Sequence, residues 1–333
     1  MKIVTLGEIM LRLSPGGNGR FVQAKGFEAV YGGAEANVAV LLAQLGEEAY
    51  FITKLPAHEI GQAAINELRG YGVRTQYVAR GGERMGLYFL EKGASGRPSK
   101  VIYDRAYSAM AGAVAKDFEF KKIFNNCTWF HFTGITPALS DAAAALTEYA
   151  CRKAKAAGAT VSCDINYRNT LWPKEKAGKV LSRLMEYVDV CITNPEQTED
   201  VFGIGAGKGT DDEALNGIAW QLASRFGIQK TAFTLRRNVS ADDNVLSAAL
   251  CSEGKCQRSG EYPVHIIDRV GGGDAFAAGL IYGMMHGFPD ERAVEFASAA
   301  NAYKHTVEGD FCLAGLEEIS ELAWGSGDGR IRR

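Results

Sequence analysis

The sequence predicts an α/β fold in which helices cover both faces of a doubly wound, mostly parallel sheet and a small β-sheet forms a lid. Three observations predict it. Apolar runs rich in β-forming residues alternate with helical patterns along most of the 333 residues, as in a parallel sheet with crossover helices. Two stretches, about 10–33 and about 73–107, break this alternation with Gly, aromatic and β-forming residues. The chain has no internal repeat, and we expect one domain over 1–333 with the lid inserted in it.

The period of the apolar residues predicts the individual elements. Short apolar runs predict core strands at 2–7, 49–55, 128–134, 159–165, 189–194, 231–236 and 244–250. Apolar residues at helical spacing predict helices at 35–46, 141–158 and 212–227. The two stretches without a helical period are expected to form antiparallel strands that stand off the main sheet as a lid over an active site.

Composition excludes several classes of protein. The chain carries 37 basic and 39 acidic residues, a net charge of -2, which predicts no nucleic-acid partner and no acidic membrane. The N-terminus begins directly with a strand-like run, without the pattern of a signal peptide, and no segment is long and apolar enough to span a membrane. We expect a cytoplasmic protein.

Cysteine and histidine spacing predicts no metal site built from side chains. The seven cysteines lack a CxxC pair and any metal or disulfide spacing, so we expect small core residues in a reducing compartment. Cys251 and Cys256 are close in sequence but have no further metal partner. The five histidines show no HxH or HExxH spacing and are expected in packing or at the surface.

The glycine-rich stretch DRVGGGDAFAAG (268–279) opens a helical pattern. The first N–H groups of a helix bind anions, and glycines let the backbone come close to one. Gly271, Gly272 and Gly273 could therefore hold a phosphoryl group during transfer, and Asp274 could accept a proton from an attacking hydroxyl. The alternative is a tight connection with Asp274 as the helix N-cap. The residues alone leave both interpretations open.

The sequence lacks two common nucleotide-binding motifs. GIGAGKGT (203–210) is not a P-loop, because Phe202 stands where the first Gly should be and Gly209 follows Lys208. We expect a mobile surface loop there and a frayed tail at 325–333. No GxGxxG follows a strand, which argues against a nicotinamide cofactor.

The stretch before Asp274 resembles the DxxGxGDxFxxG signature of the ribokinase-like, phosphofructokinase-B type carbohydrate kinases. A second signature of that family is matched near the N-terminus by YGGAEANVAVLLAQLG (31–46). The resemblance implies a ribokinase-like fold with a β lid and an ATP-dependent phosphotransferase. It also implies that Asp274 is the catalytic base and that Gly271, Gly272 and Gly273 form the anion hole.

The residues of the expected lid and strand ends point to an acidic substrate. VIYDRAYSA (101–109) places Tyr103 and Arg105 on one face of a lid strand, and SCDINYRNTLW (162–172) carries Asn166 and Arg168 after a strand. Two arginines that face a pocket suit a carboxylate. The alternative is that both arginines are surface ion-pair partners.

GGAEAN, the lid YxR, HFTGITPALS, DINYRNTLW and KHTVEGDF together resemble the 2-keto-3-deoxygluconate kinases of that family over essentially the whole chain. The resemblance implies that the sugar acid is bound by Gly33, Asn37, Tyr88, Tyr103, Arg105, Asn166, Arg168 and Asp310. Arg12 also fits an acidic substrate. The implied reaction transfers the ATP γ-phosphoryl group to the C6 hydroxyl of 2-keto-3-deoxygluconate, with Mg²⁺ held mainly by nucleotide phosphates and water.

The nucleotide side departs from the family pattern. Expected contacts are Asn194, Thr234, Arg236, Asn301, Gly271 and Gly273. The family has NxxE after a central strand, but counting from Asn194 the Glu position holds Gln197. In RRNVSADDN, Arg236 or Arg237 could contact phosphates, or the segment is an exposed charged loop.

Other functions stay open at this point. One is another kinase of the family acting on fructose, ribose, a nucleoside or 2-keto-3-deoxygalactonate, and another is a catalytically silent sensor of sugar acid or nucleotide. The exposed edges of the lid predict a homo-oligomer that pairs through the lid.

Overall fold

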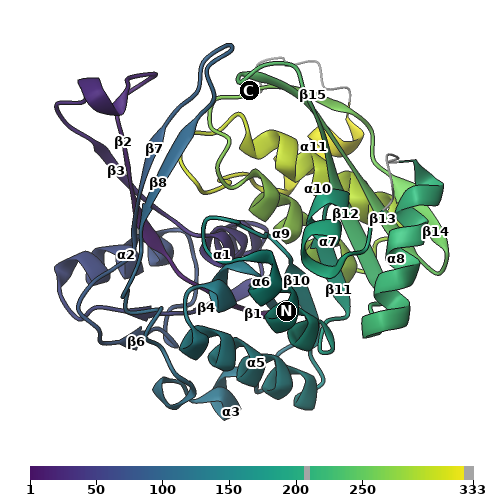
Figure 1. Cartoon of the computed structure of the whole chain (residues 1–333), viewed down its shortest axis with the longest axis horizontal. Helices are drawn as coiled ribbons and strands as arrows, with labels where there is room; N and C mark the ends of the chain where they lie inside the picture. The colour runs from purple at the N-terminus through teal and green to yellow at the C-terminus, as the bar shows by residue number, and fades with distance from the viewer. Residues whose placement is uncertain (206–210, 326–333) are drawn as a thin grey trace.

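In the computed structural model, residues 1–205 and 211–325 are described. Residues 206–210 of the surface loop expected at 203–210, and residues 326–333 of the frayed tail expected at 325–333, lie outside the described residues. The chain forms a nine-stranded sheet, a four-stranded sheet and a two-stranded sheet (Figure 1). This arrangement is the α/β fold that the alternating pattern predicts.

The nine-stranded sheet is mostly parallel. Its order is β14-β13-β12-β11-β10-β9-β1-β4, and β15 pairs with β13. The pairs from β4 to β12 are parallel, and β13, β14 and β15 are added antiparallel. The strands are β1 (Lys2–Leu6), β4 (Glu48–Ile52), β9 (Trp129–Thr133), β10 (Thr160–Asp164), β11 (Val190–Thr193), β12 (Lys230–Asn238), β13 (Asp243–Ser252), β14 (Lys255–Arg258) and β15 (Tyr262–His265).

Each predicted core strand is present, and the run at 49–55 is divided. Its first part is β4, and its last two residues, β5 (Lys54–Leu55), pair with β6 (Ala79–Arg80) in the two-stranded sheet. The sequence analysis missed β14 and β15, which are short and half exposed and so lack an apolar run.

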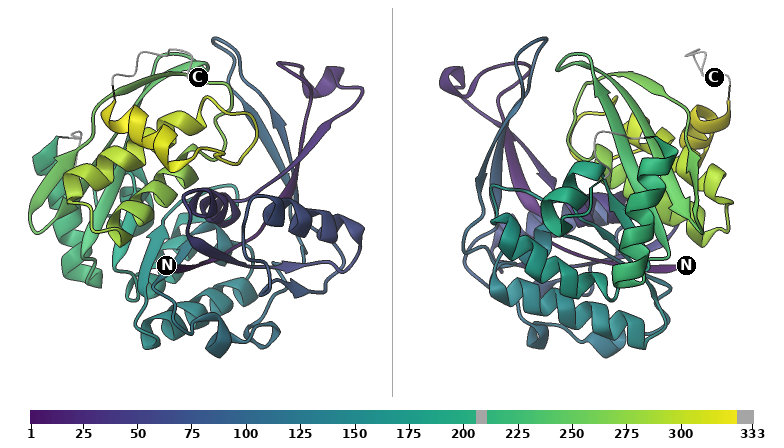
Figure 2. Two further views of the ribbon diagram at one scale, coloured as in Figure 1. Left: turned by 180° about the vertical axis from the view of Figure 1, so that it is seen from behind. Right: turned by 45° about the vertical axis from the view of Figure 1, so that its right-hand side comes forward.

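Helices cover both faces of the large sheet (Figures 1 and 2). Consecutive strand residues such as Ile3 and Val4 enter opposite cores, because side chains alternate along a strand. One core contains α1 (Ala34–Gln44), α2 (Glu59–Gly70), α9 (Gly272–Met285), α10 (Asp290–Lys304) and α11 (Leu316–Trp324). The other contains α3 (Phe120–Ile123), α5 (Asp141–Ala156), α6 (Lys174–Met185), α7 (Pro195–Phe202) and α8 (Asp212–Phe226). Short helical turns complete the set: η1 (Phe21–Gln23), η2 (Ala115–Asp117) and α4 (Ile135–Ala138). None of the helices in 1–205 or 211–325 combines the length and apolarity needed to cross a bilayer.

The four-stranded sheet is the lid, and it rises from the edge of the core (Figure 2). Its order is β3-β2-β7-β8, from β2 (Met10–Ser14), β3 (Glu28–Gly32), β7 (Leu87–Glu91) and β8 (Lys100–Asp104). The expectation of antiparallel strands is wrong for one pair, because β2 and β7 are parallel. The connection between these two strands includes α1 and α2, and a parallel pair needs a connection of such length.

The tip of the lid touches the core. The hairpin between β7 and β8 places Ser95 against the turn between β12 and β13. The backbone N–H of Ser95 donates to Asp242 Oδ2 at 2.6 Å, and Ala241 N–H donates to the Ser95 carbonyl at 2.8 Å. The lid is therefore held at both its base and its tip. Pairing through the lid edges of two chains stays a prediction.

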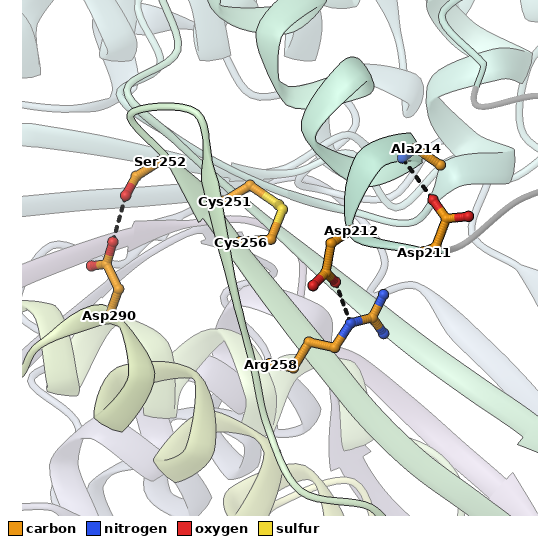
Figure 3. The surroundings of a disulfide bond; sticks show 8 residues. All are labelled: Asp211, Asp212, Ala214, Cys251, Ser252, Cys256, Arg258 and Asp290. Carbon is orange, nitrogen blue, oxygen red and sulfur yellow. Dashed lines mark hydrogen bonds and ion pairs between the residues drawn. A yellow bond between two sulfur atoms is a disulfide. The ribbon is translucent and has the colours of Figure 1, made fainter.

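The expectation that all seven cysteines are unpaired is wrong for one pair. Cys251 on β13 and Cys256 on β14 form a disulfide (Figure 3). The two-residue turn between the strands has positive φ at Glu253 and Gly254, as hairpin turns require, and this register sets Cys251 opposite Cys256. The spacing was a hairpin signal rather than a metal signal. The other five cysteines are buried and free.

Candidate active site

A large cavity of about 750 Å³ opens between the carboxyl ends of the parallel strands, the lid and the start of α9. Ligands of open α/β sheets bind at this edge. With the exception of Arg12, the residues predicted for the base, the anion hole, the sugar and the nucleotide line this cavity. They are Gly33, Asn37, Tyr88, Tyr103, Arg105, Asn166, Arg168, Asn194, Thr234, Arg236, Gly271, Gly272, Gly273, Asp274, Asn301 and Asp310.

Gly271, in the glycine loop, has a backbone conformation that residues with a side chain rarely adopt. Gly271 is the N-cap of α9 with φ of 86°, and a Cβ there would overlap the carbonyl oxygen of Asp310. A Cβ at Gly272 would overlap the ring of His305, whereas Gly273 has open space beside it. The loop packs tightly against the segment after α10. The first turn of α9, whose N–H groups have no partner within the helix, lies at the cavity and can bind an anion.

Asp274 lies in the first turn of α9, and Gly271 rather than Asp274 is the N-cap. The N-cap interpretation of Asp274 is therefore wrong. Its side chain is buried and accepts a hydrogen bond of 2.7 Å from Nδ2 of Asn37. Burial raises the pKa of Asp274 to about 8, and the bond from Asn37 opposes part of this rise. A carboxyl group with a pKa near neutrality beside an anion site suits a general base.

Arg105 reaches the cavity from the end of β8 and is already paired. Its Nε and Nη2 donate to Oε2 of Glu8 at 2.8 and 2.6 Å, and Ser108 donates to the other oxygen of Glu8. Tyr103 lies under the guanidinium, 5.5 Å from ring centroid to Cζ. Arg105 is buried, so it is neither a surface ion-pair partner nor an uncompensated charge. Glu8 holds it in place.

Arg168 lines the cavity after the end of β10. It is exposed and forms no ion pair with the rest of the described chain. Asp164 is half-buried at the end of β10, and desolvation raises the pKa of Asp164 to about 7, opposed by the positive charge of Arg168. Asn166 has φ of 39° and donates its backbone N–H to Asp164 at 3.0 Å. This turn directs Arg168 toward the cavity.

The nucleotide side lies at the ends of β11 and β12. Asn194 caps α7 by accepting the backbone N–H of Gln197 at 2.9 Å. Thr234 and Arg236 on β12 line the cavity. Arg237 points away, with 66% of its side chain exposed, because neighbours on a strand face opposite sides. The two arginines that the sequence left as alternatives are thus separated by the strand.

Known proteins share this fold. Residues 1–310 match the model of the pfkB family of carbohydrate kinases. The chain belongs to this family. The match confirms the family and the fold that the two signatures predicted.

Individual relatives resemble this kinase over its whole length. The crystal structure of a 2-dehydro-3-deoxygluconokinase from Thermotoga maritima is 50% identical, has a TM-score of 0.95, and covers 97% of this chain and 98% of its own. A 2-dehydro-3-deoxygalactonokinase from Haloferax volcanii is 32% identical over 100% of this chain and 99% of its own length. A fructokinase from Xylella fastidiosa, crystallised with bound ATP, shares the fold at 24% identity with a TM-score of 0.79, covering 96% of this chain and 97% of its own.

Arg12 does not have the role expected of it in this kinase. Its side chain is buried and bonds Asp268 at 2.5 Å and Asp310 at 2.8 Å, and it does not line the cavity. Two carboxylates therefore compensate its charge before any substrate arrives. Tyr88 donates to the other oxygen of Asp310. Arg12 joins the lid strand β2 to Asp268 at the start of the glycine loop and to Asp310 after α10 rather than binding sugar.

Sequence reasoning missed two acidic residues of the kinase cavity. One is Glu8. The other is Glu35, which is buried and accepts hydrogen bonds from Thr133 N, Thr133 Oγ1 and Thr136 Oγ1 at 3.0, 2.8 and 2.7 Å. Burial raises the pKa of Glu35. Both had a signal in the sequence. Glu8 is a charged residue directly after an apolar strand, and Glu35 is a charged residue inside the apolar helix start GGAEAN.

The residues present fit a Mg²⁺ ion carried by the nucleotide. Among the described residues, no three His, Cys, Asp or Glu side chains cluster in a way that could hold a metal. Gln197 Oε1 and Asn301 Oδ1 are buried, have no hydrogen-bond partner in the described structure, and belong to residues that line the cavity. Buried oxygens without partners are costly, and a nucleotide or the waters around its metal would satisfy them.

Proposed function

We propose that this kinase transfers the γ-phosphoryl group of ATP to the C6 hydroxyl of 2-keto-3-deoxygluconate. The observation that carries the proposal is the layout of one cavity. The glycine loop and Asp274 lie at one part of its wall, and Arg168, Arg105 and Tyr103 lie on the lid side and at the end of β10. A sugar acid has a hydroxyl for the first group and a carboxylate for the second.

The base and the anion hole divide the chemistry. Asp274 takes the proton of the attacking hydroxyl, and Asn37 orients the carboxylate that takes it. The N–H groups of the first turn of α9 stabilise the charge on the transferring phosphoryl group. Mg²⁺ held by the nucleotide would neutralise charge on the phosphates, and Gln197, which lines the cavity, stands in place of the family Glu.

The carboxylate of the substrate binds two arginines, one unpaired in the described structure and one already ion-paired with Glu8. Arg168 supplies a free positive charge. Arg105 supplies directed N–H groups, because Glu8 compensates its charge and fixes its orientation. Paired, charge-assisted hydrogen bonds favour a carboxylate over a neutral hydroxymethyl group. The name of the Thermotoga maritima relative, 50% identical, agrees with this substrate.

The epimer is a separate choice. A galactonate-derived 2-keto-3-deoxy acid has the same carboxylate, and the Haloferax volcanii relative is named for it. Arg105 and Arg168 cannot distinguish the two acids, because both acids present the same carboxylate to them.

ATP-dependent release of ADP tests the proposal. The substrates are 2-keto-3-deoxygluconate, its galactose-derived epimer, fructose and ribose, with Asp274→Asn as the control. Activity confined to the acids and lost in the control supports the proposal. Equal activity on fructose or ribose overturns the acid assignment, and no activity on any of the four favours a silent sensor.

A further inference from the structure

Lys304 is a buried lysine to which the proposed reaction assigns no role. It is the last residue of α10 and is 0% exposed. Its ammonium donates to the carbonyl oxygens of Val307 at 3.0 Å and Asp268 at 3.3 Å. No carboxylate of the described chain pairs with it. Burying an ammonium is expensive without such partners, so its position calls for a reason.

The carboxylates nearby are already in use. Asp268 and Asp310 pair with Arg12, so backbone carbonyls replace the water around the ammonium of Lys304. Burial lowers the pKa of Lys304, and the charges of Asp268 and Asp310 oppose this. Rings of carbonyl oxygens are also how proteins hold monovalent cations stripped of water. Lys304 binds two carbonyl oxygens, which are the kind of ligand that a bare monovalent cation also takes.

This site lies directly behind the glycine loop. Cε of Lys304 is 3.2 Å from the position that a Cβ on Gly271 would take. Asp268, whose carbonyl Lys304 binds, begins the loop and accepts the backbone N–H groups of Val270 and Gly309, both at 3.2 Å. Lys304 thus holds Asp268 in place. The carboxylate of Asp268 in turn accepts hydrogen bonds from the glycine loop at Val270 and from the segment after α10 at Gly309.

We propose that Lys304 is a positioning residue that acts as a built-in monovalent cation for the anion hole. It holds the Asp268 carbonyl and the turn at Val307, and its fixed charge supports the loop when negative charge develops on the transferring phosphoryl group. This inference rests on the glycine loop being the anion hole, as proposed above. It predicts that the kinase needs no added monovalent metal ion.

A purely structural role is the competing explanation. A lysine near the end of a helix also stabilises the last carbonyl groups and the helix dipole. That role predicts lost stability with an unchanged kcat in whatever remains folded. The proposed role predicts a lower kcat that an added cation restores, because removing the ammonium leaves its carbonyl partners behind.

The experiment compares wild type, Lys304→Ala and the volume-preserving Lys304→Met. Turnover of whichever sugar the wild type phosphorylates is measured in tetramethylammonium buffer, and then with K⁺ or NH₄⁺ added. The sugar assignment can therefore fail without affecting this test. Lys230→Ala is the matched control, because Lys230 pairs with Asp290 at the opposite end of α10.

We expect kcat of Lys304→Ala to fall by roughly tenfold to a hundredfold, while KM for the sugar changes little. K⁺ or NH₄⁺ restores much of the loss in Lys304→Ala and less in Lys304→Met, whose side chain fills the site. Wild type and Lys230→Ala ignore the added cation. The inference is overturned if K⁺ strongly activates the wild type, if folded Lys304→Ala keeps its kcat, or if neither cation restores it. If neither variant folds, the response of the wild type alone decides.

Discussion

The side-chain amide of Asn37 donates a 2.7 Å hydrogen bond to the carboxylate of Asp274, across 237 residues of sequence. Asn37 belongs to the first helix and Asp274 to the start of α9, the two motifs that identify the family. The contact joins the signatures physically. It also sets the protonation of the proposed base, since burial favours the neutral acid and this bond favours the anion.

The rate should therefore rise with pH. Only deprotonated Asp274 accepts a proton, and its pKa is raised to about 8, so kcat/KM increases as pH rises through about 8 and levels above it. Asn37→Leu removes a bond that favours the anion, which raises the pKa further and moves this limb to higher pH. The pH profile of kcat/KM checks both. A limb near pH 4, unmoved by the substitution, would contradict the assignment.

Substitution of Arg12 should lower the free energy of unfolding. Arg12→Met leaves Asp310 buried without its cation and leaves Asp268 only the more distant Lys92, at 3.9 Å, which costs about 3–5 kcal/mol in the free energy of unfolding. Arg84→Met is the matched control, because the pair of Arg84 with Asp104 is largely exposed and is worth below about 1 kcal/mol. Denaturant titration measures both. Equal losses would show that burial does not set the strength of these pairs.

Reduction of the disulfide should affect stability and leave catalysis alone. Cys251 and Cys256 are five residues apart, and closing so short a loop contributes about 2 kcal/mol in the chain-entropy account. Neither cysteine lines the cavity. Thermal unfolding and kcat are measured with and without reductant, and Cys256→Ser should show no response to it. A fall in kcat on reduction would contradict this separation.

Weakening the contact at the lid tip should raise KM. Asp242→Ala removes the acceptor for the Ser95 N–H, and one such hydrogen bond is worth about 0.5–1.5 kcal/mol. We expect KM for the sugar to rise by about twofold to tenfold with a smaller change in the free energy of unfolding. Steady-state kinetics across sugar concentrations gives the answer. An unchanged KM would mean that the tip contact does not bias the lid toward closure.

Local patterns predicted the strands of the core, whereas the resemblance to the kinase family predicted which residues bind sugar and nucleotide. The parallel strands are apolar runs, and the residues of the cavity belong to motifs that end those strands. Partner choice was beyond that reasoning. Arg105 pairs with Glu8 across 97 residues and Arg12 with Asp310 across 298. The sequence can indicate that an arginine lies in a pocket, but its ion-pair partner depends on the tertiary fold.

The same limit explains the lid and the cysteines. Nothing within β2 or β7 states that they run parallel, because that direction depends on the two helices between them. The pairing of Cys251 with Cys256 depends on a two-residue turn that sets the register of β13 and β14. The turn residues, Glu253 and Gly254, were a readable signal that cysteine spacing alone concealed.

The measurement that tests the account most directly is the preference for the acid in wild type and Arg168→Met. kcat/KM is determined for 2-keto-3-deoxygluconate and for the analogue whose carboxylate is replaced by a carboxamide, with Arg237→Met as the control. The account predicts that wild type and control favour the acid and that Arg168→Met loses about tenfold to a hundredfold of that preference. An unchanged preference in Arg168→Met would contradict the proposal that this cavity recognises a sugar acid through Arg168.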